Sequence, residues 1–283
     1  MKHPDKWRET VDPFSLNYHD FRPLEILGYP HAGNDVFCAK GIYKNKEVRA
    51  YIKAARQKGP WIENEVSVLS SLKSDVFPEI IDYGFEGVPF SVSLELPGER
   101  LSNIVGENEN LASIKYMREY GRKLAEFHQL TPQANVWPDR KFYHLPPDEL
   151  LRKLDLEYLK NYFSNPPKES VRCFCHGDFH YANILWRNHH ISAILDFEMA
   201  GYGSRDFDIA WALFTRPGQK FMKSEEELQE FLKGYGEIGE YDLCAIRFYM
   251  AQCYTWFLEF TKDKEYCEYA RNRLNGIQKD RCF

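Results

Sequence analysis

Residues 175–185 read CHGDFHYANIL and residues 194–198 read ILDFE, which places a polar loop between apolar runs. Asp178, Asn183 and Asp196 supply a carboxylate, an amide five residues later and a second carboxylate after the next apolar run. Such a set can surround one metal-bound phosphate, because phosphoryl transfer depends on positioning and on hard oxygen ligands for Mg²⁺. The pattern predicts that Asp178 orients an acceptor hydroxyl and takes its proton, and that Asn183 and Asp196 bind Mg²⁺.

Upstream of residue 97 the sequence predicts a small β-rich lobe. Short apolar runs between turn residues are typical of strands, and the apolar spacing from Ile62 to Leu72 is that of a helix. Strands are expected at Leu24–Leu27, Val36–Ile42, Val48–Ala54, Ile80–Phe85 and Phe90–Leu96. We therefore expect a first lobe over residues 1–96, in which residues 1–20 form an extension without an assigned function.

Downstream of Pro97 and Gly98 the pattern changes to long amphipathic helices. They are expected at Leu111–Gln129, at Pro147–Phe163 and over much of Glu225–Leu274. The strand-like segment Val171–Phe197, which contains the polar loop, lies among them. A β-rich lobe joined to a helix-rich lobe over residues 97–283 predicts an α+β fold.

The polar loop resembles the catalytic loop of the aminoglycoside phosphotransferase and choline kinase families, which are small-molecule kinases with a protein-kinase-like fold. The match is to H-x-D-x-x-x-x-N at His176, Asp178 and Asn183 and to D-F-x at Asp196. The chain lacks a full G-x-G-x-x-G loop, D-F-G and A-P-E, so protein phosphorylation is not expected. The resemblance implies a bilobal fold with a small antiparallel-sheet N-lobe containing one helix and a larger, mainly helical C-lobe.

The resemblance also implies a phosphate clamp in the first lobe. Lys53 ends a predicted strand that would aim its charge at the α- and β-phosphates of a nucleotide. Glu65 is similar to the family's paired glutamate, with Glu63 as the competing residue. The alternative reading of Lys53 is a solvated surface charge.

Two further segments are assigned to nucleotide binding by the same resemblance. Gly33 lies where the nucleotide-covering loop would be and would allow the backbone to approach the phosphates. Glu95 and Leu96 resemble the interlobe linker, whose backbone groups would hydrogen-bond a purine. These backbone contacts do not distinguish ATP from GTP.

Downstream motifs leave the subfamily open. Residues 196–198 (DFE) and 205–209 (RDFDI) resemble choline and ethanolamine kinases, whereas the HGD motif followed by His180 resembles aminoglycoside phosphotransferases. Asp208 is expected to brace the catalytic loop. Glu198 either assists a second metal through water or faces solvent.

Composition excludes several other classes. The 283 residues are 43% hydrophobic and 16% aromatic, which argues against disorder. The net charge of −5 provides no basic field for nucleic acid or anionic lipid. The charged N-terminus and the lack of any run of ~20 apolar residues predict a cytoplasmic protein without a membrane span. The seven cysteines show no CxxC pair, so most are expected to be reduced.

Two features of the second lobe bear on the acceptor. Seven acidic residues between Ser224 and Leu243 either attract a cationic acceptor or form a solvated helix face. The aromatic residues between Phe248 and Phe260 either cradle a quaternary ammonium group or pack in the core.

Together these observations predict a phosphotransferase that moves the γ-phosphate of ATP or GTP to a hydroxyl of a small molecule, either cationic or neutral. An aminoglycoside-like acceptor is favoured, and a choline- or ethanolamine-type kinase is the alternative. A non-catalytic nucleotide-binding regulatory protein is the alternative from another class.

Overall fold

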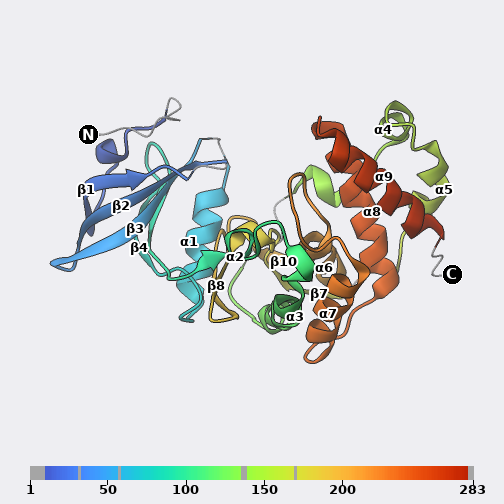
Figure 1. Ribbon diagram of the computed structural model, residues 1–283. Coiled ribbons are helices and arrows are strands. Elements are labelled where there is room, and N and C mark those ends of the chain that lie inside the picture. Colours follow the sequence, from blue (N-terminus) through green and yellow to red (C-terminus); the bar gives the residue numbers. More distant parts are fainter. Residues whose placement is uncertain (1–9, 31–32, 57–58, 135–138, 169–170, 280–283) are drawn as a thin grey trace. The chain divides into compact units, whose positions relative to one another are not determined.

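Five antiparallel strands form the sheet of the first of two compact units (Figure 1). The computed structural model describes residues 10–30, 33–56, 59–134, 139–168 and 171–279. The first unit comprises Met1–Gly98, Pro132–Ala134 and Ser192–Ala200, and the second comprises the remainder. The sheet order is β1-β2-β3-β5-β4. Its strands are β1 (Phe21–Gly28), β2 (Asp35–Tyr43), β3 (Lys46–Ala54), β4 (Ile80–Gly84) and β5 (Phe90–Leu94).

Alternating side chains of these strands fill the core of the first unit. Phe37 and Ala39 of β2 and Ala50 and Ile52 of β3 are fully buried, as expected for a sheet with one covered face. At Gly41 a Cβ atom would lie 2.3 Å from the Phe21 ring, so only glycine lets that ring pack against β2. Helix α1 (Trp61–Ser71) packs against β4 and β5.

A segment far along the chain completes the first unit. The Ile194 N–H donates to the Val76 carbonyl at 2.8 Å, and the Ser192 hydroxyl donates to the Pro97 carbonyl at 2.7 Å. The Asn64 side chain, on α1, donates to the carbonyls of Glu198 and Ala200. Residues 192–200 are thereby bound to a unit whose other parts lie at least 57 residues earlier in the chain.

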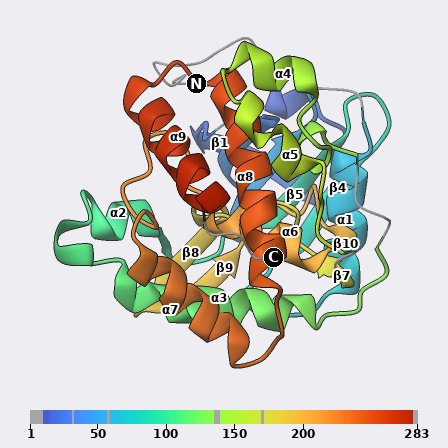
Figure 2. The ribbon, with the colours of Figure 1, turned by 90° about the vertical axis from the view of Figure 1, so that its right-hand side faces the viewer.

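The second unit is mainly helical (Figure 2). Its long helices are α3 (Ile114–His128), α6 (Arg205–Leu213), α7 (Glu225–Gly236), α8 (Leu243–Phe260) and α9 (Lys264–Lys279), and its short ones are α2 (Leu101–Val105), α4 (Asp148–Lys153) and α5 (Lys160–Phe163). Two small sheets pair β7 (Arg172–Cys175) with β10 (Gly201–Ser204), and β6 (Glu99–Arg100) with β8 (Ile184–Arg187), which is followed by β9 (His190–Ile194). Single 3₁₀ turns lie at Pro13–Ser15, Glu109–Leu111, Lys141–Tyr143, Glu157–Leu159 and Tyr181–Asn183.

Helices α3 and α7 lie side by side with their backbones in contact (Figure 2). A Cβ atom at Gly121 would lie 1.9 Å from the Phe231 carbonyl oxygen, and one at Gly234 would lie 1.9 Å from that of Arg118. Neither backbone can move away without separating the helices, so both positions require glycine.

A buried carboxylate fixes the start of α7. Glu227 is fully buried and accepts hydrogen bonds from the Ser113 hydroxyl and from the backbone N–H groups of Met222, Lys223 and Ser224. Ser224 in return caps the helix by accepting from the Glu227 N–H. Burial alone would raise the pKa of Glu227, but the Ser113 hydroxyl and these backbone donors hold it below its usual value.

The α+β class predicted from the sequence is confirmed, with local corrections. The helix expected over Pro147–Phe163 is wrong as one element, because it breaks into α4, a 3₁₀ turn and α5. Asp155 adopts a left-handed φ of 54°, and the Leu156 N–H turns back to the Leu151 carbonyl, which closes α4. Leu111 also has a positive φ, so the helix expected from Leu111 begins at Ile114.

Two sequence expectations concern cysteines and membrane spans. Cys244 is disulfide-bonded and departs from the expected reduced state. In the described part of the chain, the free thiols are Cys38, Cys173, Cys175, Cys253 and Cys267.

Within the described residues, no helix is long and apolar enough to cross a membrane.

Candidate functional site

One lysine surrounded by three carboxylates forms the polar centre of the first unit. Lys53 Nζ lies 2.7 Å from Glu65 Oε2, 2.8 Å from Asp196 Oδ1 and 2.9 Å from Glu198 Oε1. Lys53 comes from β3 and Glu65 from α1, while Asp196 and Glu198 come from the segment that joins this unit late in the chain. Lys53 therefore pairs with Glu65 and not with Glu63, and it is not a solvated surface charge.

Neighbouring amides fix the orientation of these carboxylates. Glu65 Oε2 also accepts from the Phe197 N–H at 2.9 Å, which ties α1 to the Asp196 segment. Glu198 Oε1 accepts from the Asn34 side chain at 2.7 Å. The Glu198 side chain is only 16% exposed, so the alternative of a solvent-facing carboxylate is wrong.

The charges of this cluster are strongly coupled. Burial alone would lower the pKa of Lys53, but Asp196, Glu65 and Glu198 hold it well above its usual value. Burial raises the pKa of Glu65 to about 7, and the nearby charges of Glu198 and Asp196 add to this effect while Lys53 opposes it. Three carboxylates around one lysine leave an excess of negative charge, which a further cation would neutralise.

The donor set fits a hard divalent cation. One oxygen from each of Glu65, Asp196 and Glu198 lies within 4.8 Å of the others. Carboxylate oxygens are the ligands that Mg²⁺ prefers. Asp196 is the most accessible of the three, with a side chain that is 37% exposed. Its φ of 68° places the backbone in a left-handed turn just after β9.

In the second unit, a single carboxylate is surrounded by donors. Asp178 Oδ1 accepts from Trp211 Nε1 at 2.7 Å, and Oδ2 accepts from the Asn183 side chain at 3.1 Å. His180 Nε2 lies 3.6 Å from the same Oδ2. The 3₁₀ turn Tyr181–Asn183 brings Asn183 back to Asp178 across the five-residue spacing seen in the sequence.

Asp208, near the start of α6, holds the loop that carries Asp178. Its two carboxylate oxygens accept from the backbone N–H groups of His176 and Gly177, each at 2.9 Å. Gly177 has a φ of 74°, which glycine adopts without strain. Arg140 donates to the Gly177 carbonyl at 2.8 Å. The bracing role expected for Asp208 agrees with these contacts.

His180 and two arginines keep Asp178 ionised. Burial alone would raise the pKa of Asp178, but His180, with further help from Arg140 and Arg216, holds it well below its usual range. Arg140 and Arg216 both lie over the Trp211 ring, 4.7 and 5.0 Å from its centroid. Asp178 is therefore a charged hydrogen-bond acceptor at neutral pH.

The remaining predicted positions are less constrained. At Gly33 a Cβ atom would meet nothing within 4 Å, and residues 31 and 32 of the same loop lie outside the described residues. The Glu95 N–H donates to the Arg49 carbonyl, and the Glu95 carboxylate pairs with the Arg49 side chain at 2.7 Å. The carbonyl of Glu95 and the backbone of Leu96 remain candidates for a purine contact.

The aromatic residues between Phe248 and Phe260, which the sequence offered as an acceptor site, serve mainly to pack helix α8. Phe248, Tyr254 and Trp256 are buried, which agrees with core packing, whereas Phe260 is 57% exposed and does not pack in the core. Lys141 covers the rings of Trp256 and Phe260, at 4.4 and 4.7 Å from their centroids.

Sequence reasoning missed Trp211 as a partner of Asp178. A signal existed, because Trp211 lies three residues after Asp208 and thus on the same face of α6. It also missed Arg140 and Arg216, which no motif marks.

Comparison with known proteins identifies the family and the fold. A model of the phosphotransferase enzyme family (APH) matches residues 54–247. Among curated proteins, none matches the sequence significantly. Among the solved structures that share the fold, three with 15–16% identity are described below.

The first is a thermostable mutant of aminoglycoside phosphotransferase APH(4)-Ia in ternary complex with ADP and hygromycin B, with a TM-score of 0.57 over 94% of this chain and 95% of that one. The second is the macrolide 2′-phosphotransferase MphH from Brachybacterium faecium, with a TM-score of 0.53 over 90% and 92%. The third is an ethanolamine kinase from Plasmodium vivax, with a TM-score of 0.53 over 86% and 79%.

The fold and the match of the family model define a small-molecule phosphotransferase, and the kinase-like fold predicted from the sequence is confirmed. Because the model covers more than half of its length, the chain belongs to the phosphotransferase enzyme family.

Proposed function

We propose that this enzyme transfers the γ-phosphate of ATP or GTP to a hydroxyl of a small molecule. The observation that carries the proposal is Asp178, a partly exposed carboxylate that Trp211 and Asn183 orient and that His180, Arg140 and Arg216 keep ionised. A charged, fixed acceptor of this kind can orient a hydroxyl for in-line attack and take its proton.

In this proposal the first lobe, residues 1–96, binds the nucleotide. Lys53, held by Glu65, pairs with the α- and β-phosphates, since it is the cation at the centre of the first unit's polar cluster. Gly33 lies in the covering loop, and the backbone at Glu95 and Leu96 contacts the purine. The complex of APH(4)-Ia with ADP supports a nucleotide donor.

Asn183 and Asp196 are proposed to hold Mg²⁺, which when bound would neutralise phosphate charge. Both offer oxygen ligands, as Mg²⁺ requires. Asp196 pairs with Lys53 at 2.8 Å, so the lysine competes with a metal for that carboxylate. Binding of the nucleotide phosphates to Lys53 would end this competition.

The proposed acceptor is aminoglycoside-like and binds to the second lobe, residues 97–283. His180, beside Asp178, is the sequence feature that favours it, and the hygromycin B complex of APH(4)-Ia is consistent with it. The ethanolamine kinase from Plasmodium vivax supports the choline- or ethanolamine-type alternative. Lys141 already covers the aromatic faces of Trp256 and Phe260 that a quaternary ammonium group would use.

The test is nucleotide diphosphate release with Mg²⁺ and ATP or GTP, across aminoglycosides, macrolides, choline and ethanolamine. We expect one aminoglycoside-like class to stimulate release, and Asp178→Asn to lower the stimulated rate by ~10²–10⁴-fold without weakening nucleotide binding. Asp139→Asn, at an exposed aspartate of the same unit, is the control. Equal rates for Asp178→Asn and wild type would refute the role of Asp178, and tight nucleotide binding with no turnover would favour the regulatory alternative.

A further inference from the structure

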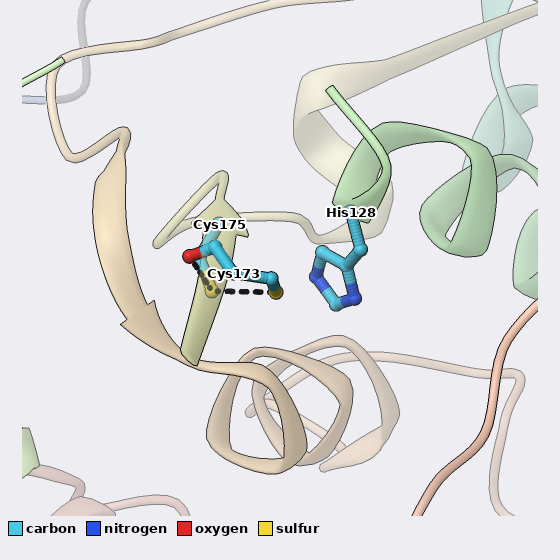
Figure 3. Close-up of side chains that lie close together, drawn as sticks. All are labelled: His128, Cys173 and Cys175. Atoms are coloured by element: carbon cyan, nitrogen blue, oxygen red, sulfur yellow. Dashed lines mark hydrogen bonds between the residues drawn. The ribbon is translucent and has the colours of Figure 1, made fainter. Parts of the chain in front are cut away.

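Three side chains with nitrogen and sulfur ligand atoms meet inside the second unit (Figure 3). His128 is the last residue of α3, and Cys173 and Cys175 lie on β7. Because the two cysteines are two residues apart on a strand, their side chains point to the same face, and the imidazole lies beside that face (Figure 3). One ligand atom from each residue lies within 4.8 Å of the others.

The distance between the two sulfur atoms is close to the distance between two thiolates bound to one metal ion. Cys173 Sγ and Cys175 Sγ are 3.6 Å apart. Two thiolates bound to Zn²⁺ at ~2.3 Å with a tetrahedral angle lie about 3.8 Å apart. A shift of a few tenths of an ångström would therefore bring both sulfurs into bonding distance of one ion.

We propose that His128, Cys173 and Cys175 form a binding site for a thiophilic cation such as Zn²⁺. Soft sulfur and imidazole ligands select such ions, and three protein ligands leave one position for water. Binding forms two metal–sulfur bonds and one metal–nitrogen bond, and the protons held by the three ligand atoms, the imidazole nitrogen included, leave to solvent. Two thiolates and a neutral imidazole balance the divalent charge of the ion.

The surroundings of His128 suit a metal ligand. Its Nδ1 lies 2.7 Å from the Tyr235 hydroxyl, and its Nε2 lies 3.0 Å from Asp208 Oδ2. One ring nitrogen can bind the ion while the other keeps its oxygen partner, which is the usual outer arrangement of metal-bound histidines. Cys175 is fully buried, whereas Cys173 is partly exposed and gives the ion a point of entry.

This site differs in chemistry from the carboxylate cluster of the first unit. Glu65, Asp196 and Glu198 offer only oxygen, which Mg²⁺ prefers, whereas Mg²⁺ binds sulfur poorly. An excess of Mg²⁺ should therefore occupy oxygen sites and leave the nitrogen–sulfur site available.

The test is a Co²⁺ titration of the full-length, reduced protein in excess Mg²⁺, followed by displacement with Zn²⁺. We expect one equivalent of Co²⁺ to bind with a thiolate-to-cobalt charge-transfer band, which Zn²⁺ abolishes. Cys173→Ser should weaken binding by at least the ~10–100-fold that loss of an outer partner costs. The control, Cys267→Ser, removes another partly exposed free thiol, on α9, and should bind as wild type does.

Two outcomes would overturn the site. One is the absence of a charge-transfer band at stoichiometric Co²⁺, and the other is an equal loss of binding in Cys173→Ser and Cys267→Ser. Cys175→Ala gives a second, independent variant of the same cluster. Circular dichroism melting of each variant separates lost binding from lost folding. None of these measurements uses turnover, so failure of the proposed function would not affect them.

A consequence for turnover rests on the proposed function. Cys175 directly precedes His176, and Asp208 bonds both His128 and the His176 N–H. An ion that draws His128 and Cys175 together would shift the loop that carries Asp178. Buffered Zn²⁺ in excess Mg²⁺ should then inhibit wild type and not Cys173→Ser, and equal inhibition of both would refute this coupling.

Discussion

The two polar centres of this protein have opposite charge arrangements. In the first unit, three carboxylates surround the single cation Lys53. In the second, the single carboxylate Asp178 is surrounded by donors and lies in the field of His180, Arg140 and Arg216. The pKa of Glu65 is raised to about 7, whereas that of Asp178 is held well below its usual range.

The difference teaches that burial alone does not decide the charge of a carboxylate. Glu65 and Asp178 both lose solvation, which raises a carboxyl pKa in each case. The balance between burial and the neighbours decides the outcome. At Glu65 burial, with added effects from Glu198 and Asp196, outweighs the opposing charge of Lys53 and raises the pKa, whereas at Asp178 the neighbours His180, Arg140 and Arg216 outweigh burial and lower it. The first centre is thus suited to receive a further cation, and the second is suited to accept a hydrogen bond from a neutral hydroxyl.

Removing the lysine should disturb the first centre most. Lys53→Met leaves three carboxylates without their cation and removes the proposed phosphate contact. We expect kcat/KM for the nucleotide to fall ~10²–10³-fold in steady-state kinetics. Mg²⁺ should raise the melting temperature of Lys53→Met more than that of wild type, because the lysine no longer competes for Asp196.

The control for that change is Lys40→Met, at a half-exposed lysine of β2. It should alter neither kcat/KM nor the response to Mg²⁺. If Mg²⁺ does not change the melting temperature of Lys53→Met, the acidic cluster does not bind a metal.

Glu227 tests whether neutral donors alone can keep a buried carboxylate ionised. Its partners are the Ser113 hydroxyl, the Asn108 side-chain amide and backbone N–H groups. Glu227→Gln should lower the free energy of unfolding by about 2 kcal/mol at pH 7, as measured by urea denaturation. Because the folded pKa lies below the usual 4.5, this stabilisation is present above pH 4.5 and declines as pH falls through the folded pKa.

The difference between Glu227→Gln and wild type should therefore shrink in acid. Glu226→Gln, at the exposed neighbouring position in the first turn of α7, should lower stability by no more than ~1 kcal/mol. A difference that stays constant down to the acid transition would mean that the charge of Glu227 contributes nothing.

Trp211 tests how much one oriented donor contributes to the second centre. Trp211→Phe keeps an aromatic ring but removes the hydrogen bond to Asp178 Oδ1. We expect kcat to fall about tenfold with KM for both substrates unchanged, because Asp178 loses its orientation and the binding surfaces do not change. Trp256→Phe removes a similar buried hydrogen bond, to His144, and should leave kcat unaltered. If the two variants lose kcat equally, Trp211 has only a structural role.

The smallest expected effect concerns Glu198. Glu198→Gln keeps an oxygen near Lys53 and removes one of three negative charges. We expect about threefold more Mg²⁺ to be needed for half-maximal turnover, with kcat at saturating Mg²⁺ unchanged. Glu47→Gln, at an exposed glutamate that pairs with Lys40, is the matched control. An unchanged Mg²⁺ requirement would limit Glu198 to holding Lys53 and Asn34.

Local spacing explains which parts of this arrangement the sequence could predict. The contact between Asn183 and Asp178 follows from a five-residue spacing closed by one turn, and each strand of the first sheet carries its own apolar pattern. The partners Trp211, Arg140 and Arg216 lie 33 to 38 residues from Asp178 in the chain, and only folding brings them near it. The break at Asp155 was missed because a left-handed residue leaves the apolar periodicity of the segment intact.

The discontinuous first unit has a consequence for synthesis on the ribosome. Glu65 and Lys53 emerge roughly 130 residues before Asp196, a delay of about 7–26 s at ~5–20 residues per second. During that time Lys53 and Glu65 lack the other two carboxylates of their cluster. A polypeptide ending at Gly98 would lack both Asp196 and Glu198, so the amino-terminal lobe alone cannot contain its own cation site.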